Sequence, residues 1–259
     1  MMKKTLVALA LAVTTVSGSA MAWTANGTGS SLELGGTLTP KAVVTPWEVL
    51  VGMAVNNLNA DIKSGTKVVD IPVTNSITVL GIRTQTNQAF NGMPGISPKI
   101  DFNGAIETTK FVGGYTPLTL DVNDNTGAKI GTLTAKLGAA AMGSVKGTDI
   151  ADRYARLTVQ AGSAFEGGLP APDGAFLVRD GHAFLNTVNP AFLANIDTQG
   201  MDISTTGFYS SFDTPTATFS AAYGSGIKAG EKINLTLDAP AANDAIVWKA
   251  SLPVTVSYQ

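Results

Sequence analysis

The chain has no cysteine, a single histidine and few charged residues, and each shortage excludes a class of stabilisation or chemistry. Without cysteine no disulfide can form, so a hydrophobic core must hold the fold together, and 259 residues are enough for one large domain or two small ones. One histidine and no cysteine disfavour a zinc site. Lys and Arg number 17 against 19 Asp and Glu, and this mild acidity gives no support for nucleic-acid binding.

Catalytic motifs are also missing. His182 has no nucleophile-elbow sequence beside it and is interpreted as an exposed loop histidine. Residues 121–127 resemble the start of a calcium loop, but the glycine comes one position late and Thr132 replaces the bidentate acid, so we expect a polar hairpin tip. No phosphate loop or cofactor motif occurs, and we expect no enzyme. A secreted glycosidase stays open as the alternative, because the spacing of two carboxylates in space cannot be seen in a sequence.

The first 22 residues have the pattern of a secretory signal. Lys3 and Lys4 precede an apolar run at 6–13, and Ala20-Met21-Ala22 has the small-residue pattern of a cleavage site. The run is too short to span a bilayer comfortably. We therefore expect export and a mature chain that begins at Trp23.

Most of the remaining chain alternates apolar and polar residues over short stretches, as β-strands do. A hairpin is expected around 123–127, and the spacing predicts an all-β antiparallel sandwich rather than βαβ units. An outer-membrane barrel is disfavoured because aromatics make up only 7% of the chain, too few for two girdles. Strands are expected at 47–51, 67–73, 77–83, 100–102, 118–122, 130–135, 156–160, 216–223, 232–238 and 246–258.

Residues 139–207 depart from this rhythm and are interpreted as an elaboration inserted into the sandwich. Asn189 and Pro190 form the N-cap and first position of a helix. A weaker helical turn is expected at 149–154. Neither linker composition nor a repeat marks a separate domain.

The two ends of the mature chain each carry an amphipathic strand. In residues 30–38, Leu32, Leu34 and Leu38 share one face with Gly36 as a notch. At the other end the alternating residues are Leu252, Val254, Val256 and Tyr258. Both could be ordinary strands of one sandwich. Alternatively, the sandwich lacks its final strand and the arm of a neighbouring subunit completes it, with main-chain ladders giving affinity and alternate side chains filling pockets.

Several short motifs, in order over nearly the whole chain, resemble FaeG-type fimbrial major subunits of enteric bacteria. They are Trp23, Leu34-Gly35-Gly36-Thr37-Leu38-Thr39, Trp47-Glu48-Val49-Leu50-Val51-Gly52, Leu80-Gly81-Ile82-Arg83-Thr84, Gly127-Ala128-Lys129-Ile130-Gly131, Ala222-Tyr223-Gly224-Ser225-Gly226-Ile227 and Pro253-Val254-Thr255-Val256-Ser257-Tyr258. Ile246 departs from the glycine common in other pilins, which weakens any transfer from those more distant subunits.

The resemblance implies an immunoglobulin-like pilin that lacks its last strand and polymerises by donor-strand exchange. It implies residues 23–40 as the donor extension and 41–259 as a single pilin domain. The implied partners are neighbouring subunits of a homopolymer, a periplasmic chaperone, an outer-membrane usher and a host glycan or glycoprotein receptor. The chain would be exported through the periplasm to a surface fimbrium. A minor subunit at the tip or base of the fibre is the runner-up.

Residue roles follow from these expectations. Leu32, Leu34, Gly36 and Leu38 would form the donor strand, and Leu252, Val254, Val256 and Tyr258 the strand beside the groove. For receptor binding the candidates in the 139–207 region are Arg153, Tyr154, Arg179, Asp180, His182 and Phe184, whose polar and aromatic groups could bond and stack on a sugar. For Tyr154 and Phe184 the competing interpretation is local core.

Overall fold

The computed structural model describes residues 25–26, 34–39, 44–171 and 181–259. The chain divides into two compact units, residues 1–41 and 42–259. The predicted signal segment lies outside the described residues.

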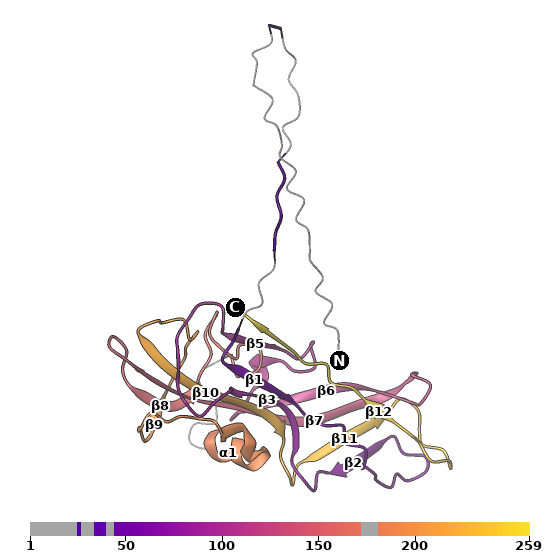
Figure 1. The fold of residues 1–259 in the computed structure, drawn as a ribbon. Helices are drawn as coiled ribbons and strands as arrows, with labels where there is room; N and C mark the ends of the chain where they lie inside the picture. The colour runs from indigo at the N-terminus through magenta and orange to yellow at the C-terminus, as the bar shows by residue number, and fades with distance from the viewer. Residues whose placement is uncertain (1–24, 27–33, 40–43, 172–180) are drawn as a thin grey trace, which may run out of the picture. The chain divides into compact units, whose positions relative to one another are not determined.

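The second unit is built around one long strand, β7 (Lys129–Gly147). The first half of β7 pairs with β6 (Tyr115–Asn123) and β11 (Lys232–Leu237), and the second half with β10 (Ala217–Ile227) and β8 (Arg153–Leu157). The main path of the sheet runs β1-β3-β10-β7-β11-β2 (Figure 1). The other strands of this sheet are β1 (Trp47–Val51), β2 (Val68–Pro72), β3 (Ile77–Thr84), β4 (Phe90–Asn91), β9 (Ile203–Phe208) and β12 (Lys249–Ala250).

A second, two-stranded sheet pairs β5 (Pro98–Asp101) with β13 (Thr255–Tyr258). The core packs buried branched residues around a cluster of rings. Trp47, Phe165 and Phe212 are mutually in contact, and Phe165 stacks on Tyr223 with ring centroids 5.5 Å apart. The Tyr223 hydroxyl donates to the Gly168 carbonyl at 3.1 Å, which satisfies its polar atom inside the core. The all-β prediction is confirmed.

The other face of the main sheet is lined with glycine, and short helices pack on it. Gly81 on β3 pairs with Gly224 on β10, and the Phe192 ring fills the space that two side chains would take. Phe192 belongs to the 3-10 helix η3 (Pro190–Leu193), which follows α1 (Gly181–Val188). Phe184 of α1 similarly lies over Gly138. Sheet glycines therefore create slots that aromatic side chains occupy.

Local predictions had mixed outcomes. The Asn189 cap is confirmed, since its side chain accepts from Ala191 N, although the helix is 3-10. Asp124 accepts from the Thr126 and Ala128 amides, which confirms the polar hairpin tip, and these bonds together with the Thr126 hydroxyl lower the Asp124 pKa. The helical turn at 149–154 is wrong, because these residues are irregular until β8 begins. Residue 139, the expected start of the elaboration, falls inside β7.

Candidate functional site

Strand β1 leaves part of the core uncovered. It pairs with β3 along one edge and ends the main strand path. Side chains of a strand alternate between faces, so Val49 and Val51 share a face with Trp47, which is buried in the core. Yet Val49 is 42% exposed and Val51 60% exposed. None of the described strands therefore covers this face of β1 beyond Trp47.

The C-terminal strand shows a complementary pattern. From residue 251 to 259 exposed and half-buried residues alternate strictly, and Leu252, Val254, Val256 and Tyr258 are the half-buried ones, packed against the core. The alternation predicted for these four residues is confirmed. Among the described strands β13 pairs with β5 alone, so its other edge has no strand on it.

These two strands approach each other around Ile96 and Ser97. The Trp47 indole donates to the Ile96 carbonyl at 2.6 Å. Gln259, which follows β13, exchanges two backbone hydrogen bonds with Ser97, both 3.1 Å. We call the apolar surface formed by Val49, Val51 and the half-buried face of residues 252–258 the edge groove. An unpaired sheet edge with apolar side chains of this kind can accept one further strand through main-chain bonds and side-chain pockets.

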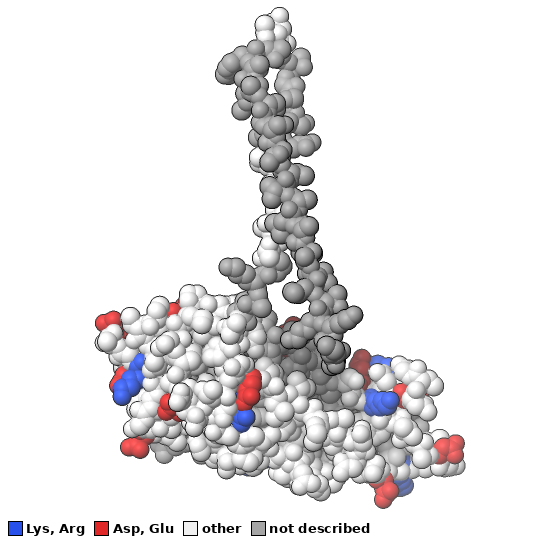
Figure 2. Space-filling model, viewed as in Figure 1, with Lys and Arg blue, Asp and Glu red and all other residues white. Residues whose placement is uncertain are grey.

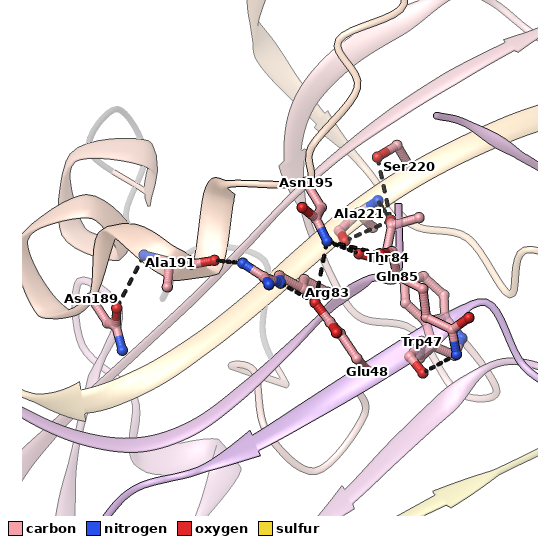
Figure 3. Close-up of polar contacts among 10 residues, drawn as sticks. All are labelled: Trp47, Glu48, Arg83, Thr84, Gln85, Asn189, Ala191, Asn195, Ser220 and Ala221. Atoms are coloured by element: carbon pink, nitrogen blue, oxygen red, sulfur yellow. Dashed lines mark hydrogen bonds and ion pairs between the residues drawn. The ribbon is translucent and has the colours of Figure 1, made fainter. Parts of the chain in front are cut away.

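Polar contacts hold β1 in place where apolar packing does not (Figure 3). Arg83 on β3 binds Glu48 of β1 and the Ala191 carbonyl of η3. Asn195 donates to the Glu48 carboxylate at 3.2 Å and to the Thr84 and Gln85 carbonyls, each at 3.0 Å. The groove wall is thus tied to the helical segment through the edge strand's polar residues.

The described part of the predicted donor arm is extended and exposed. Residues 34–39 have no assigned secondary structure, and Leu34 and Leu38 are 88% and 96% exposed. A Cβ added to Gly36 would meet nothing within 4 Å among the described residues. Leu32 lies outside the described residues. The arm offers apolar side chains that its own structure does not bury.

Strand β5, the partner of β13, is attached to the loop after β8 by an ion pair. Lys99, largely buried, donates to Glu166 at 2.9 Å and to the Ser163 carbonyl at 2.7 Å. The Lys99 ammonium, followed by the Gly162 amide, lowers the pKa of Glu166. Because β5 is the partner of β13, this ion pair supports the C-terminal strand from behind.

The four described receptor-binding candidates lie in different surroundings. Tyr154 and Phe184 are buried in a second apolar cluster with Leu185 and Phe192, which confirms the local-core interpretation, and burial raises the Tyr154 pKa. A buried ring cannot stack on a sugar. His182 is exposed, but it lies on α1 rather than on a loop. Arg179 and Asp180 lie outside the described residues.

Arg153 lines a groove of about 740 Å³ between β8 and β9. We call it the β8–β9 groove. Arg156 and Tyr209 line it too, and sequence reasoning missed both. Tyr209 is 54% exposed. Arg153 and Arg156 are three residues apart on β8, whose register against β7 is unshifted, so their side chains leave opposite faces of the strand.

The described helices include none that is long and apolar enough to span a bilayer. Figure 2 shows that charged side chains are sparse and scattered on the face in view.

Comparison with known proteins agrees with this architecture. The family model described as "Fimbrial, major and minor subunit" matches residues 2–259. The chain is 28% identical to K88 fimbrial protein AB of Escherichia coli, 29% to K88 fimbrial protein AC and 28% to K88 fimbrial protein AD, in each case over 99% of this chain and all of the relative. The chain therefore belongs to the K88-type family of fimbrial major and minor subunits, structural proteins that associate with one another in surface fimbriae.

Proposed function

We propose that this chain is a major fimbrial subunit that polymerises by donor-strand exchange. The arm of one copy, residues 23–40, fills the edge groove of the next copy. The observation that carries the proposal is the exposure of Val49 and Val51 on the same strand face as the buried Trp47. The half-burial of the alternate residues from Leu252 to Tyr258, on the C-terminal strand, also supports the proposal.

The energetics of such an exchange are favourable. Burying each leucine side chain contributes about 1.5–3 kcal/mol, so Leu32, Leu34 and Leu38 together contribute on the order of 5–9 kcal/mol before ordering costs. Backbone hydrogen bonds to the open edges of β1 and β13 add a ladder that fixes the register. Gly36 lies where the groove narrows, so that the main chain can approach closely.

The same open edges explain the expected route of assembly. An unpaired apolar edge promotes aggregation. A periplasmic chaperone covers the C-terminal strand and its groove after export, and an outer-membrane usher exchanges the chaperone for the next subunit's arm. A minor subunit of the same fibre would use the same groove and differ in copy number. Membership of a structural family favours either role over a secreted glycosidase.

Replacement of Leu34 by Asp tests the donor strand. Leu34→Asp should leave export to the periplasm intact and abolish laddered polymers on unheated gels, because a carboxylate cannot enter an apolar pocket without a large desolvation cost. Thr37→Asp is the matched control, since it places the same charge on the opposite face of the arm and should still give fibres. Normal fibres from Leu34→Asp would refute the assignment.

We also propose that the subunit binds a host glycoconjugate, and that the β8–β9 groove is the place. Of the four candidates that the structure describes, Arg153 lines this groove, and its neighbours there include hydroxyl, amide and aromatic groups. Sugar sites combine such hydrogen-bonding groups with an aromatic ring. Most residues that line the groove belong to the 139–207 region, and Phe208 and Tyr209 follow directly after it.

A further inference from the structure

Strand β1 separates the edge groove from the helical segment. Val49 and Val51 lie on the face that forms the edge groove, and Leu50 lies on the opposite face. Leu50 pairs with Gly81, and Gly81 is one of the glycines over which the Phe192 ring packs. A change in the position of β1 is therefore felt on both sides, by the groove and by the helical segment.

Few contacts hold β1 in the sheet. It pairs with β3, and among the described strands none pairs with its other edge. Trp47 is the one buried residue of the strand, so apolar packing adds little beyond it. A strand with so few buried contacts opens locally at a lower free-energy cost than a strand inside a sheet. The arm can pair with β1 only while β1 is in place, so time spent in the open state weakens arm binding in proportion.

Residues 190–199, which begin with η3, contact β1 from the helical side, and we call them the strap. The side-chain amide of Asn195 donates to the Glu48 carboxylate at 3.2 Å and to the Thr84 and Gln85 carbonyls at 3.0 Å each (Figure 3). Thr84 is the last residue of β3, and Glu48 belongs to β1. A single side chain of the strap therefore bridges the edge strand to its neighbour.

The other end of the strap is fixed to the middle of the sheet. The Asp197 amide donates to the Ser220 hydroxyl at 2.9 Å, and the Ser144 hydroxyl donates to the Asp197 carbonyl at 2.6 Å. The Gln199 side chain donates to the Ser144 hydroxyl at 3.0 Å and to the Thr218 carbonyl at 3.1 Å. Ser144 and Ser220 are buried residues of the central strands β7 and β10. The strap thus connects the centre of the sheet to its weakly held edge.

We propose that the strap is a positioning element for strand exchange: through Asn195 it keeps β1 in place for the incoming arm, and the bound arm in turn stabilises the strap. The proposal rests on the donor-strand function and adds to it a positioning residue outside the edge groove. The two effects are linked. If the strap raises the affinity for the arm by some factor, the arm stabilises the contacts of the strap by the same factor.

The first test measures hydrogen exchange in the full mature chain with Leu34→Asp, whose own arm cannot fill a groove. A synthetic peptide with the wild-type sequence of residues 23–40 fills the groove instead. With peptide bound, the hydrogen-bonded strap amides should exchange about fivefold more slowly or less. Strand β2, at the far end of the sheet path, is the internal control and should exchange at one rate in both states. The strap amides to follow are those of Ala191, Phe192, Ala194, Ile196, Asp197 and Gln199.

The second test measures the affinity for the dye-labelled peptide by fluorescence anisotropy, in the same Leu34→Asp background. Asn195→Ala and Glu48→Ala remove one contact from its two sides, and each should weaken binding by about fivefold to tenfold. Glu48 is exposed, so its variant keeps the fold even if the Asn195 variant does not. The double variant should lose less than the product of the two factors.

Asn186→Ala is the matched control. Asn186 is an exposed asparagine on α1 whose side chain makes no hydrogen bond within the described part of the chain, so this variant should bind the peptide as the parent protein does. It removes the same amide from the same helical segment without touching β1.

The outcomes distinguish the proposal from the function on which it rests. A purely structural contact would stabilise the domain equally with and without peptide. Unchanged peptide affinity in Asn195→Ala and Glu48→Ala, or equal exchange of the strap in the two states, therefore overturns the proposal and leaves strand exchange in place. A protein that captures no peptide at all refutes the donor-strand function and the proposal with it.

Discussion

Gly224→Ala should destabilise the domain far more than the addition of one methyl group suggests. Gly224 lies in the middle of β10, hydrogen-bonded to β3 on one side and β7 on the other. Its missing side chain leaves the slot that the Phe192 ring fills. A Cβ here would lie 2.3 Å from Phe192 Cδ2 and 2.6 Å from Leu185 Cδ2. Carbon atoms in contact are about 3.5–4.0 Å apart, so the ring must move by about 1 Å or more.

The magnitude follows from how the ring can respond. Phe192 and Leu185 are both almost fully buried, and the strand beneath is fixed on both edges. If the ring adjusts within its slot, overpacking costs about 1–3 kcal/mol. If it leaves the slot, the loss approaches that of Phe→Ala, about 3–5 kcal/mol. We expect a loss of about 2–4 kcal/mol in the free energy of unfolding, which for a domain of this size lowers Tm by roughly 5–15 °C.

The assay is thermal and guanidinium unfolding followed by circular dichroism, with all proteins in one oligomeric state, because association changes apparent stability. Phe192→Ala should cost about 3–5 kcal/mol by itself, and the double variant should cost clearly less than the sum of the two single variants, because the clash with the ring is gone and only the contact with Leu185 remains. Gly35→Ala is the control, because its Cβ would meet nothing within 4 Å. Wild-type stability of Gly224→Ala, or additive effects in the double variant, would refute the slot argument.

Two further variants test the edge groove and the support of its C-terminal wall. Val51→Lys should block polymer formation on unheated gels but change domain stability by only about 0.5 kcal/mol, because Val51 is mostly exposed. The control is Val68→Lys, on the edge strand β2 at the other end of the sheet path, which should assemble normally. Fibres formed by Val51→Lys would contradict the proposed role of the edge groove. Glu166→Gln should lower stability at pH 7, and its difference from wild type should shrink as the pH falls from the usual carboxyl pKa of about 4.3 through the lower pKa of the folded state, because this carboxyl stabilises the fold only while it is ionised. Parallel pH profiles of unfolding for wild type and variant would contradict the role of the ion pair.

Strands with one apolar and one polar face could be predicted from the sequence, whereas a strand that is buried on both faces could not. The C-terminal alternation at 252–258 and the strand at 47–51 follow from period-2 patterns that are local to the chain. The second half of β7 has no such pattern, because one face packs in the core and the other lies under α1, where small residues such as Gly138 and Ala140 make room for Phe184 and its neighbours. Both faces are buried, so no period-2 pattern in the sequence reports that the strand continues past residue 138.

Helix α1 and the β8–β9 groove depend on tertiary structure that no local pattern reports. An eight-residue helix that starts at a glycine and has no acidic first turn is marginal in isolation, and packing of Phe184, Leu185 and Val188 on the glycine-lined sheet stabilises it. The apolar spacing of these three residues was the one available signal. The β8–β9 groove lies beside a parallel strand pair with a register shift, and register of that kind is set by partners distant in sequence.

The edge groove illustrates how a domain can keep an apolar surface open without collapsing over it. A strand that buried its apolar side chains for stability would close the groove, so β1 must be held by other means. Its Glu48 binds Arg83 and Asn195, and Gln85 donates to the Trp47 carbonyl at 2.9 Å, so polar contacts fix the strand while Val49 and Val51 stay exposed. Arg83 and Asn195 are in turn fixed by η3 and its Phe192 slot. In the proposed assembly the glycine-lined face therefore acts on polymerisation indirectly, because it anchors the helical segment that keeps β1 in position for the incoming arm.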